Sequence, residues 1–222
     1  MLAAVKRLLP VWLKAPVRRV IKAIKYRYRR YRIAQPVSHG EPLKIIVGAA
    51  ETHQDGWYST NEEWLDITRA EDWEAVFEGK RVLTHVVAEH VFEHLTYEEC
   101  RTALAQIARH MEPGGRIRIA VPDGNHPDSE YLRHVGINGI GDDAADHKQL
   151  LTVDLLERLM EEAGFAPTQI EGYDTSGTLV QRPYSAEDGF IYRSRANATP
   201  ESRARWGFVD ADTSLIVDGV KS

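Results

Sequence analysis

The residues best suited to chemistry lie in one short stretch, Glu89-His90-Val91-Phe92-Glu93-His94. Its last five residues follow the His-x-x-Glu-His pattern of one group of zinc peptidases, in which helical histidines four residues apart bind the metal. Here the stretch follows a predicted strand and precedes a predicted helix start at Thr96, which leaves little helix to hold it. The spacing therefore predicts no metal site, and a zinc hydrolase built on His90 and His94 remains the distant alternative.

General acid–base chemistry needs fewer residues than a metal site. His90 is the first candidate for a general base, because an unperturbed imidazole titrates near neutral pH, and Glu89 directly precedes it. Asp123 and His147, which follows Asp146, are the next candidates. Each has an ordinary structural alternative, either an imidazole hydrogen-bonded to the backbone of a tight turn or a carboxylate that caps a turn.

The elements that position these residues are those of an α/β domain. Leu43–Val47 is apolar apart from Lys44, as a central parallel strand would be, and it leads into Gly48-Ala49-Ala50. A capping box at Thr96–Glu99 predicts the start of a helix. The other predicted elements are strands at Val82–Ala88, Arg116–Val121, Pro167–Tyr173 and Ser214–Val220, and a helix from Val153 to Gly164. This alternation predicts a mostly parallel sheet whose ligand binds beyond the carboxyl ends of its strands.

Four segments in this order resemble a known family: Leu43–Ala50, Gly56-Trp57, Ala88–Leu95 and Glu112–Asp123. The Glu-His-x-x-Glu-His-Leu and Pro-Gly-Gly-x-x-x-x-x-Val-Pro-Asp motifs look like those of the class I S-adenosylmethionine-dependent methyltransferases, in their type-11-like branch. The resemblance runs from about residue 43 to 220. It implies a Rossmann-like, seven-stranded sheet flanked by helices and methyl transfer from S-adenosyl-L-methionine to a small-molecule or glycan-type acceptor.

The resemblance also implies a set of site residues. Ile46 and Ala50 depart from the family's first loop, which usually has a polar or acidic residue and a second glycine at these positions, and Asn61 stands where a carboxylate usually binds the ribose. A cofactor-binding module of the same fold that has lost catalysis is therefore the alternative. The implied cofactor-binding residues are Val47, Gly48, Ala49, Ala50, Trp57, Asn61, Glu62, Asp66, Ala88 and Glu89, and the catalytic candidates are His90, Glu89, Asp123 and His147.

The charge distribution divides the chain into residues 1–40, an arm and linker, and residues 41–222, the methyltransferase-like domain. The first 40 residues carry eleven Lys and Arg and no Asp or Glu, whereas the remaining residues carry all 33 acidic residues. Pro10 and Pro16 predict two short helices, Leu2–Leu9 and Val17–Tyr31, followed by a linker at Gln35–Pro42. An acidic domain makes nucleic acid an unexpected partner.

The basic arm has three open interpretations. It could attach residues 1–33 to an anionic membrane surface, since bases and interfacial aromatic side chains alternate along it. It could instead pack on its own domain or on a second subunit, or serve as a nucleic-acid arm or targeting presequence. No apolar run is long enough to span a membrane, so we expect a cytoplasmic protein, peripheral at the inner membrane face.

A long insertion, residues 174–213, separates the last two predicted strands. It is rich in charged and aromatic residues, and segments of this length in a compact domain usually form lids or binding loops. We expect it to cover the acceptor, with a dimer contact as the alternative and the oligomeric state left open. Phe190–Ser194 is expected to add a short strand.

Overall fold

The computed structural model describes residues 11–50, 52–141, 144–201, 204 and 213–222. A seven-stranded sheet runs through them in the order β2-β1-β3-β4-β7-β5-β6. The strands are β1 (Leu43–Val47), β2 (Tyr58–Ser59), β3 (Leu83–Glu89), β4 (Met111–Pro122), β5 (Phe165–Tyr173), β6 (Leu179–Gln181) and β7 (Ser214–Lys221). β2, β1, β3 and β4 are parallel neighbours, whereas β7 runs antiparallel to β4 and β5, and β6 antiparallel to β5. The expected seven-stranded, mostly parallel sheet is confirmed.

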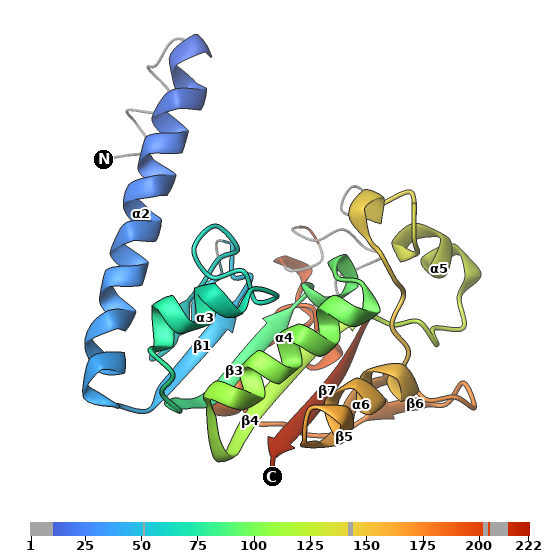
Figure 1. The fold of residues 1–222 in the computed structure, drawn as a ribbon. Coiled ribbons are helices and arrows are strands. Elements are labelled where there is room, and N and C mark those ends of the chain that lie inside the picture. The colour runs from blue at the N-terminus through green and yellow to red at the C-terminus, as the bar shows by residue number, and fades with distance from the viewer. Residues whose placement is uncertain (1–10, 51, 142–143, 202–203, 205–212) are drawn as a thin grey trace.

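Three helices cover one face of this sheet (Figure 1): α3 (Ala70–Phe77), α4 (Tyr97–His110) and α6 (Val153–Glu162). Their buried side chains, among them Trp73, Leu104 and Leu156, join the apolar strands in one large core. α4 begins with the predicted capping box, in which Thr96 and Glu99 each accept a hydrogen bond from the other's backbone N–H. A further helix, α5 (Ser129–Val135), lies beyond the carboxyl end of β4.

The opposite face of the sheet is covered by the insertion rather than by helices of the usual length. Tyr184 and Ile191 pack there on a second apolar cluster that includes Ile46, Val87 and Ile216. Phe190–Ser194 forms no strand, so that expectation is wrong, and the added strand is β6 instead.

A buried ion pair fixes the insertion to this face. Arg118 of β4 donates two hydrogen bonds of 2.7 Å to Asp218 of β7, and its remaining nitrogen, Nη1, donates to the backbone oxygens of Ser185 and Gly189. Each of the three guanidinium nitrogens thereby donates at least one hydrogen bond. Because a charge this deeply buried is stable only when it is paired, these bonds hold the backbone of the 185–189 segment against the sheet.

The basic arm differs from its prediction. One helix, α2 (Val11–His39), contains both Pro16 and Pro36, while the predicted helix Leu2–Leu9 lies outside the described residues. Pro16 is the sixth residue of α2 and lies inside the helix, where a proline removes one helical hydrogen bond. The predicted linker at Gln35–Pro42 is helical as far as His39.

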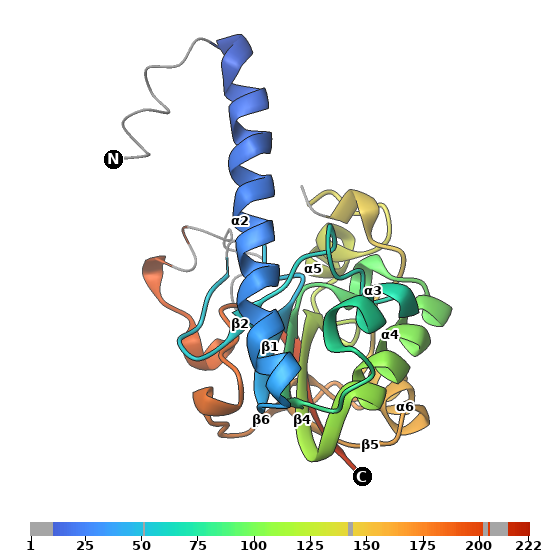
Figure 2. The same ribbon diagram turned by 60° about the vertical axis from the view of Figure 1, so that its left-hand side comes forward.

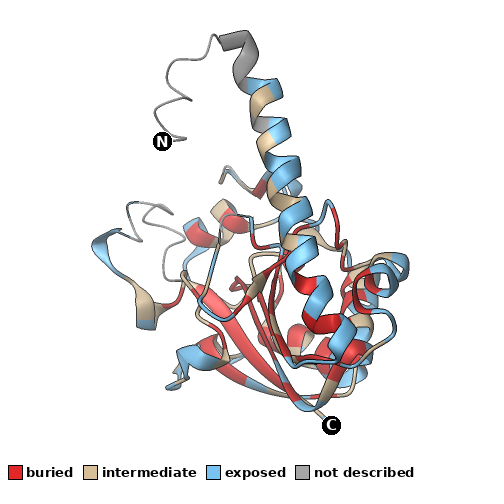
Figure 3. Cartoon of the chain, turned by 90° about the vertical axis from the view of Figure 1, so that its left-hand side faces the viewer, coloured by how far each residue is buried: buried red, intermediate tan, exposed pale blue. Residues whose placement is uncertain are grey.

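Tertiary packing explains why α2 continues through Pro36. Ile33 and Val37 are 1% and 0% exposed in the main core, and burying two such side chains stabilises by about 1.5–3 kcal/mol each. Together they match or exceed the roughly 3 kcal/mol cost of an interior proline. The rest of α2 projects from the domain with most of its residues exposed (Figures 2 and 3). None of the helices in the described part of the chain is both long and apolar enough to cross a membrane.

Candidate functional site

A cavity of about 440 Å³ opens at the carboxyl ends of β1, β2 and β3. This is the edge at which a parallel sheet of this kind binds ligands. Its lining combines apolar side chains with four carboxylates and one lysine: Gly48, Glu62, Leu65, Asp66, Ile67, Thr68, His90, Val91, His94, Leu95, Glu99, Asp146 and Lys148. The lining suits a ligand with a flat apolar part, polar hydroxyls and a positive charge.

The loop after β1 turns sharply at the edge of this cavity. Gly48 has φ +57°, and a Cβ there would lie only 2.5 Å from Cγ2 of Val91. Glycine is therefore required both by the left-handed backbone and by the close approach of the turn after β3. Ala50 also has a positive φ, +44°. The loop thus keeps the glycine-type geometry with one glycine and one alanine.

The segment after β2 supplies two of the four carboxylates of the cavity, Glu62 and Asp66. Asn61 is buried and accepts a 2.6 Å hydrogen bond from Nη1 of Arg29, which also donates to the oxygen of Ala50. Asn61 therefore faces α2 rather than the cavity, where its neighbour Glu62 is exposed instead. Asp66 also lines the cavity, and its Oδ1 accepts hydrogen bonds from the backbone N–H and hydroxyl of Thr68.

The other predicted cofactor residues have different surroundings. Val47 and Ala88 are buried in the main core, and Ala49 is buried in the cluster on the opposite face. Trp57 packs in the cluster on the opposite face, edge-on to His85. Gly48, Glu62 and Asp66 are thus the predicted cofactor-binding residues whose atoms line the cavity.

Glu89 and His90, at the end of β3, both contact other residues of the protein. The two Glu89 oxygens accept hydrogen bonds from the backbone N–H groups of Tyr192 and Arg193, which tie the insertion to the sheet edge. His90 lines the cavity with φ +53°; its Nε2 lies 3.1 Å from Oγ of Ser214 and its Nδ1 2.9 Å from Oε1 of Glu93. A carboxylate on one imidazole nitrogen is the arrangement that orients a histidine base.

Asp123 holds a turn together. Its carboxylate is 0% exposed and accepts hydrogen bonds from the backbone N–H groups of Asn125 and Tyr173. Burial raises its pKa despite these bonds. The ring of His126, close by, is tilted against the ring of Tyr131 and lies edge-on to that of Tyr173. The geometry therefore supports the structural alternative for Asp123.

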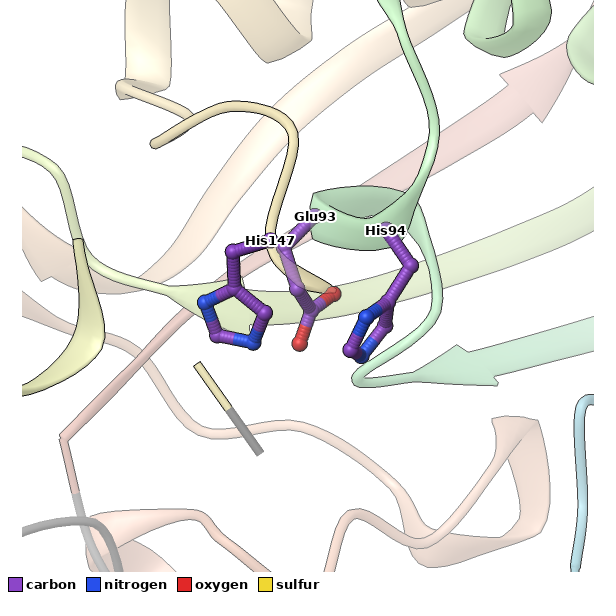
Figure 4. Close-up of side chains that lie close together, drawn as sticks. All are labelled: Glu93, His94 and His147. Atoms are coloured by element: carbon purple, nitrogen blue, oxygen red, sulfur yellow. The ribbon is translucent and has the colours of Figure 1, made fainter. Parts of the chain in front are cut away.

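A cluster that the sequence pattern did not reveal lies beside the cavity. The side chains of Glu93, His94 and His147 converge, with one ligating atom of each within 4.8 Å of the others (Figure 4). Burial raises the pKa of Glu93, and its own backbone N–H together with the nearby His94, His147 and Arg193 oppose this only in part. His90 and His94 lie around a single 3-10 turn, η1 (Phe92–His94), so the helical geometry of the zinc-peptidase pattern is absent there.

Backbone hydrogen bonds bring His147 to this turn. The oxygen of Glu93 accepts from the backbone N–H of Lys148 at 2.8 Å, and Nε2 of Gln149 donates to the oxygen of Leu95. The sequence does contain two similar dipeptides, Glu93-His94 and Asp146-His147. Nothing in their spacing indicates that they lie together in the fold.

Comparison with known proteins places this geometry in context. A profile of the methyltransferase domain family matches residues 30–170. By structure, the chain is similar to a SAM-dependent methyltransferase from Archaeoglobus fulgidus, with 14% identity, 90% of this chain and 94% of the other covered, and a TM-score of 0.48. It is also similar to a possible histamine N-methyltransferase from Thermotoga maritima, with 12% identity, 92% and 97% covered, and a TM-score of 0.45.

A third similar structure is the magnesium protoporphyrin IX methyltransferase from Synechocystis with bound SAH, with 13% identity, 93% and 87% covered, and a TM-score of 0.42. No curated protein matches the chain.

Proposed function

Because the chain belongs to the methyltransferase domain family, we propose that it binds S-adenosylmethionine in the cavity beside β1, β2 and β3. It then transfers the methyl group to a small-molecule or glycan-type acceptor. The observation that carries this proposal is the cavity itself, which lies within the matched stretch and at the ligand-binding edge of the sheet. When bound, the cofactor supplies an activated methyl group on a positively charged sulfur.

The residues at the cavity fit such a cofactor. Gly48 presents bare backbone in a left-handed turn, where a nucleoside can approach closely. Leu65 and Ile67 offer an apolar wall to the base, and Glu62 offers a carboxylate to the ribose hydroxyls. In this proposal Glu62 takes the role for which the sequence suggested Asn61, because the Asn61 oxygen already accepts from Arg29. Asp66 is assigned to the adenine amino group.

His90 is the proposed general base. Methyl transfer is an in-line displacement, so the protein mainly positions the acceptor and removes its proton. His90 lines the cavity, and Glu93 beside Nδ1 favours a tautomer in which Nε2 can accept a proton. Its replacement should therefore affect turnover more than cofactor affinity.

Calorimetric titration with S-adenosylhomocysteine tests the cofactor site. Glu62→Ala should weaken binding by about 10- to 100-fold, since a hydrogen bond to a charged group contributes about 1.5–3 kcal/mol. Glu71→Ala, which removes an exposed carboxylate from the first turn of α3, is the control and should bind like the wild type. No heat from folded wild-type protein at millimolar ligand would refute the proposal, and binding without methyl transfer would favour a non-catalytic binding module.

The projecting helix α2 supports a second part of the proposal, attachment to an anionic membrane surface. Val20, Ile24, Tyr28 and Tyr31 form a stripe on α2 in which each residue is 59–65% exposed. This exposed stripe lies nearly opposite Ile33, because residues two apart on a helix are separated by about 200°. Bases such as Lys25, Arg27 and Arg30 flank the stripe. An apolar stripe between bases is the pattern of an interfacial helix.

A further inference from the structure

The buried carboxylate of Glu93 lacks the partners that its position requires. Its side chain is 1% exposed, yet no side chain of the described residues donates a hydrogen bond of good geometry to either oxygen. Oε1 makes an ion-pair contact of 2.9 Å with Nδ1 of His90. Leaving a buried polar group without hydrogen bonds costs about 1–3 kcal/mol, and more for a charged group. Something with positive charge would remove this cost.

The two neighbouring histidines are arranged to act as ligands. Nδ1 of His147 donates a 2.7 Å hydrogen bond to the backbone oxygen of Val135, which fixes the tautomer, since a carbonyl can only accept. Nε2 of the same ring then carries a lone pair. Such a bond from the second ring nitrogen is the usual companion of a metal-ligating histidine. The ring of His94 meets His147 edge to face at 4.8 Å between centroids, with the Glu93 carboxylate beside both (Figure 4).

We propose that Glu93, His94 and His147 bind a divalent first-row transition-metal ion. Two imidazoles and one carboxylate are suited to Zn²⁺, Co²⁺ or Mn²⁺, whereas Mg²⁺ and Ca²⁺ prefer sites made of oxygen ligands. The donor atoms already lie within 4.8 Å of one another, so small side-chain movements bring them to ligating distance of one ion. The sequence spacing predicted no metal because it pairs His90 with His94, whereas this site replaces His90 with the distant His147.

The site adjoins the proposed methyl-transfer cavity. His94 and Asp146 line that cavity, and Nδ1 of His94 lies 3.1 Å from the exposed carboxylate of Asp146. Three protein ligands leave coordination positions open, and one of the three, His94, lines the cavity. Resting on the proposed function, the ion would hold an oxygen of the acceptor at this position. Metal binding itself does not depend on that function.

Metal titration of the full chain tests the site directly. Protein freed of metal with a chelator is titrated with Zn²⁺ by calorimetry and with Co²⁺ by visible absorption. We expect one tight equivalent and d–d absorption bands of a Co²⁺ site with nitrogen and oxygen ligands. His147→Asn and Glu93→Gln should each weaken binding by at least about tenfold. His85→Asn is the matched control, because His85 also lies beside a carboxylate, at 3.3 Å from Asp188, but is not part of the three-residue cluster.

The wild-type titration decides the outcome even if a variant fails to fold. Absence of a tight equivalent, or equal affinity in folded His147→Asn and wild type, would overturn the proposal. Equal weakening in His85→Asn would also overturn it, by pointing to nonspecific binding at histidines. A tight Zn²⁺ equivalent in a protein that binds no S-adenosylhomocysteine would leave the metal site intact while removing the methyltransferase function.

Discussion

At the scale of single residues, the site depends on groups that meet across turns. Gly48 fits under Val91 because it has no side chain. Glu93 is buried between His90 and the His94–His147 pair. The turn after β3 therefore serves three purposes, since it shapes the first loop, carries the proposed base and supplies two proposed metal ligands. A substitution in this turn acts on several contacts at once, so the sharpest tests alter one contact at a time.

Gly48→Ala should lower the free energy of unfolding by about 2–5 kcal/mol. The left-handed backbone costs roughly 1–2 kcal/mol for a residue with a Cβ, and the contact with Val91 adds about 1–3 kcal/mol. Gly114→Ala is the control, since Gly114 has φ +77° but open space around it, and it should incur only the first cost. In a Val91→Ala background the cost of Gly48→Ala should fall to that of Gly114→Ala. Urea unfolding measures the free energy of unfolding of each variant. If Gly48→Ala costs as much in the Val91→Ala background as in the wild type, the contact between the two residues does not cause the loss.

At the scale of elements, helix starts follow local chemistry, whereas helix lengths follow packing. The capping box Thr96–Glu99 defines the start of α4 as the sequence predicts. α2 instead extends through Pro36 because Ile33 and Val37 are buried in the core. The box also connects to the site, since Glu99 lines the cavity and accepts a 2.8 Å hydrogen bond from Nζ of Lys148.

Acid should weaken α4 through Glu99. Its hydrogen bonds with Lys148 and Thr96 lower its pKa from 4.5 to about 2. Because the folded pKa is the lower one, this stabilisation is complete above about pH 4.5 and is lost as the pH falls toward 2. The side chain is 39% exposed, so the effect is at most about 1 kcal/mol.

Urea unfolding of wild type and Glu99→Gln at pH 6, 4 and 3 tests this prediction. The stability difference should shrink as the pH falls. Glu98→Gln, which removes a carboxylate paired with Arg101 rather than with the cap, should differ from wild type by an amount that varies less with pH. A constant Glu99→Gln difference from pH 6 to 3 would be the contrary result.

At the scale of the whole molecule, the chain combines an acidic domain with a projecting basic helix. Hydrogen bonds also connect the helix to the domain, since Arg29 of α2 donates to the backbone oxygen of Ala50, in the loop after β1, and to Asn61. The insertion covers the sheet face opposite the helices and reaches the carboxyl edge at Glu89. A membrane-bound α2 would therefore hold the cavity edge at a defined distance from the lipid surface.

Replacing Val20, Ile24, Tyr28 and Tyr31 together by serine should abolish sedimentation with vesicles that contain phosphatidylserine. The apolar stripe supplies the buried area, and each base near the surface adds about 1 kcal/mol. Wild-type binding should also fall as salt is raised. The control replaces Ile137 and Ile140, which are exposed apolar side chains on the domain itself, and should sediment like the wild type.

Equal sedimentation of the stripe variant and the wild type would remove the membrane proposal. The wild type could instead fail to bind vesicles and form a dimer that the stripe substitutions dissociate. That result would make the stripe a contact between subunits.

The sequence by itself determined the order of β1, β3, α4, β4, α6, β5 and β7 along the chain and the capped start of α4, whereas the sheet edge for a ligand remains its prediction. These features depend on local patterns, namely continuous apolar strands, a capping box and turn residues. Each such pattern can be recognised within a short stretch of the sequence. Only the tertiary structure decided that α2 runs through Pro36, that Glu62 rather than Asn61 faces the cavity, and that His147 joins Glu93 and His94. Each of these results from contacts between segments far apart in the chain, where burial and hydrogen bonding outweigh local preference.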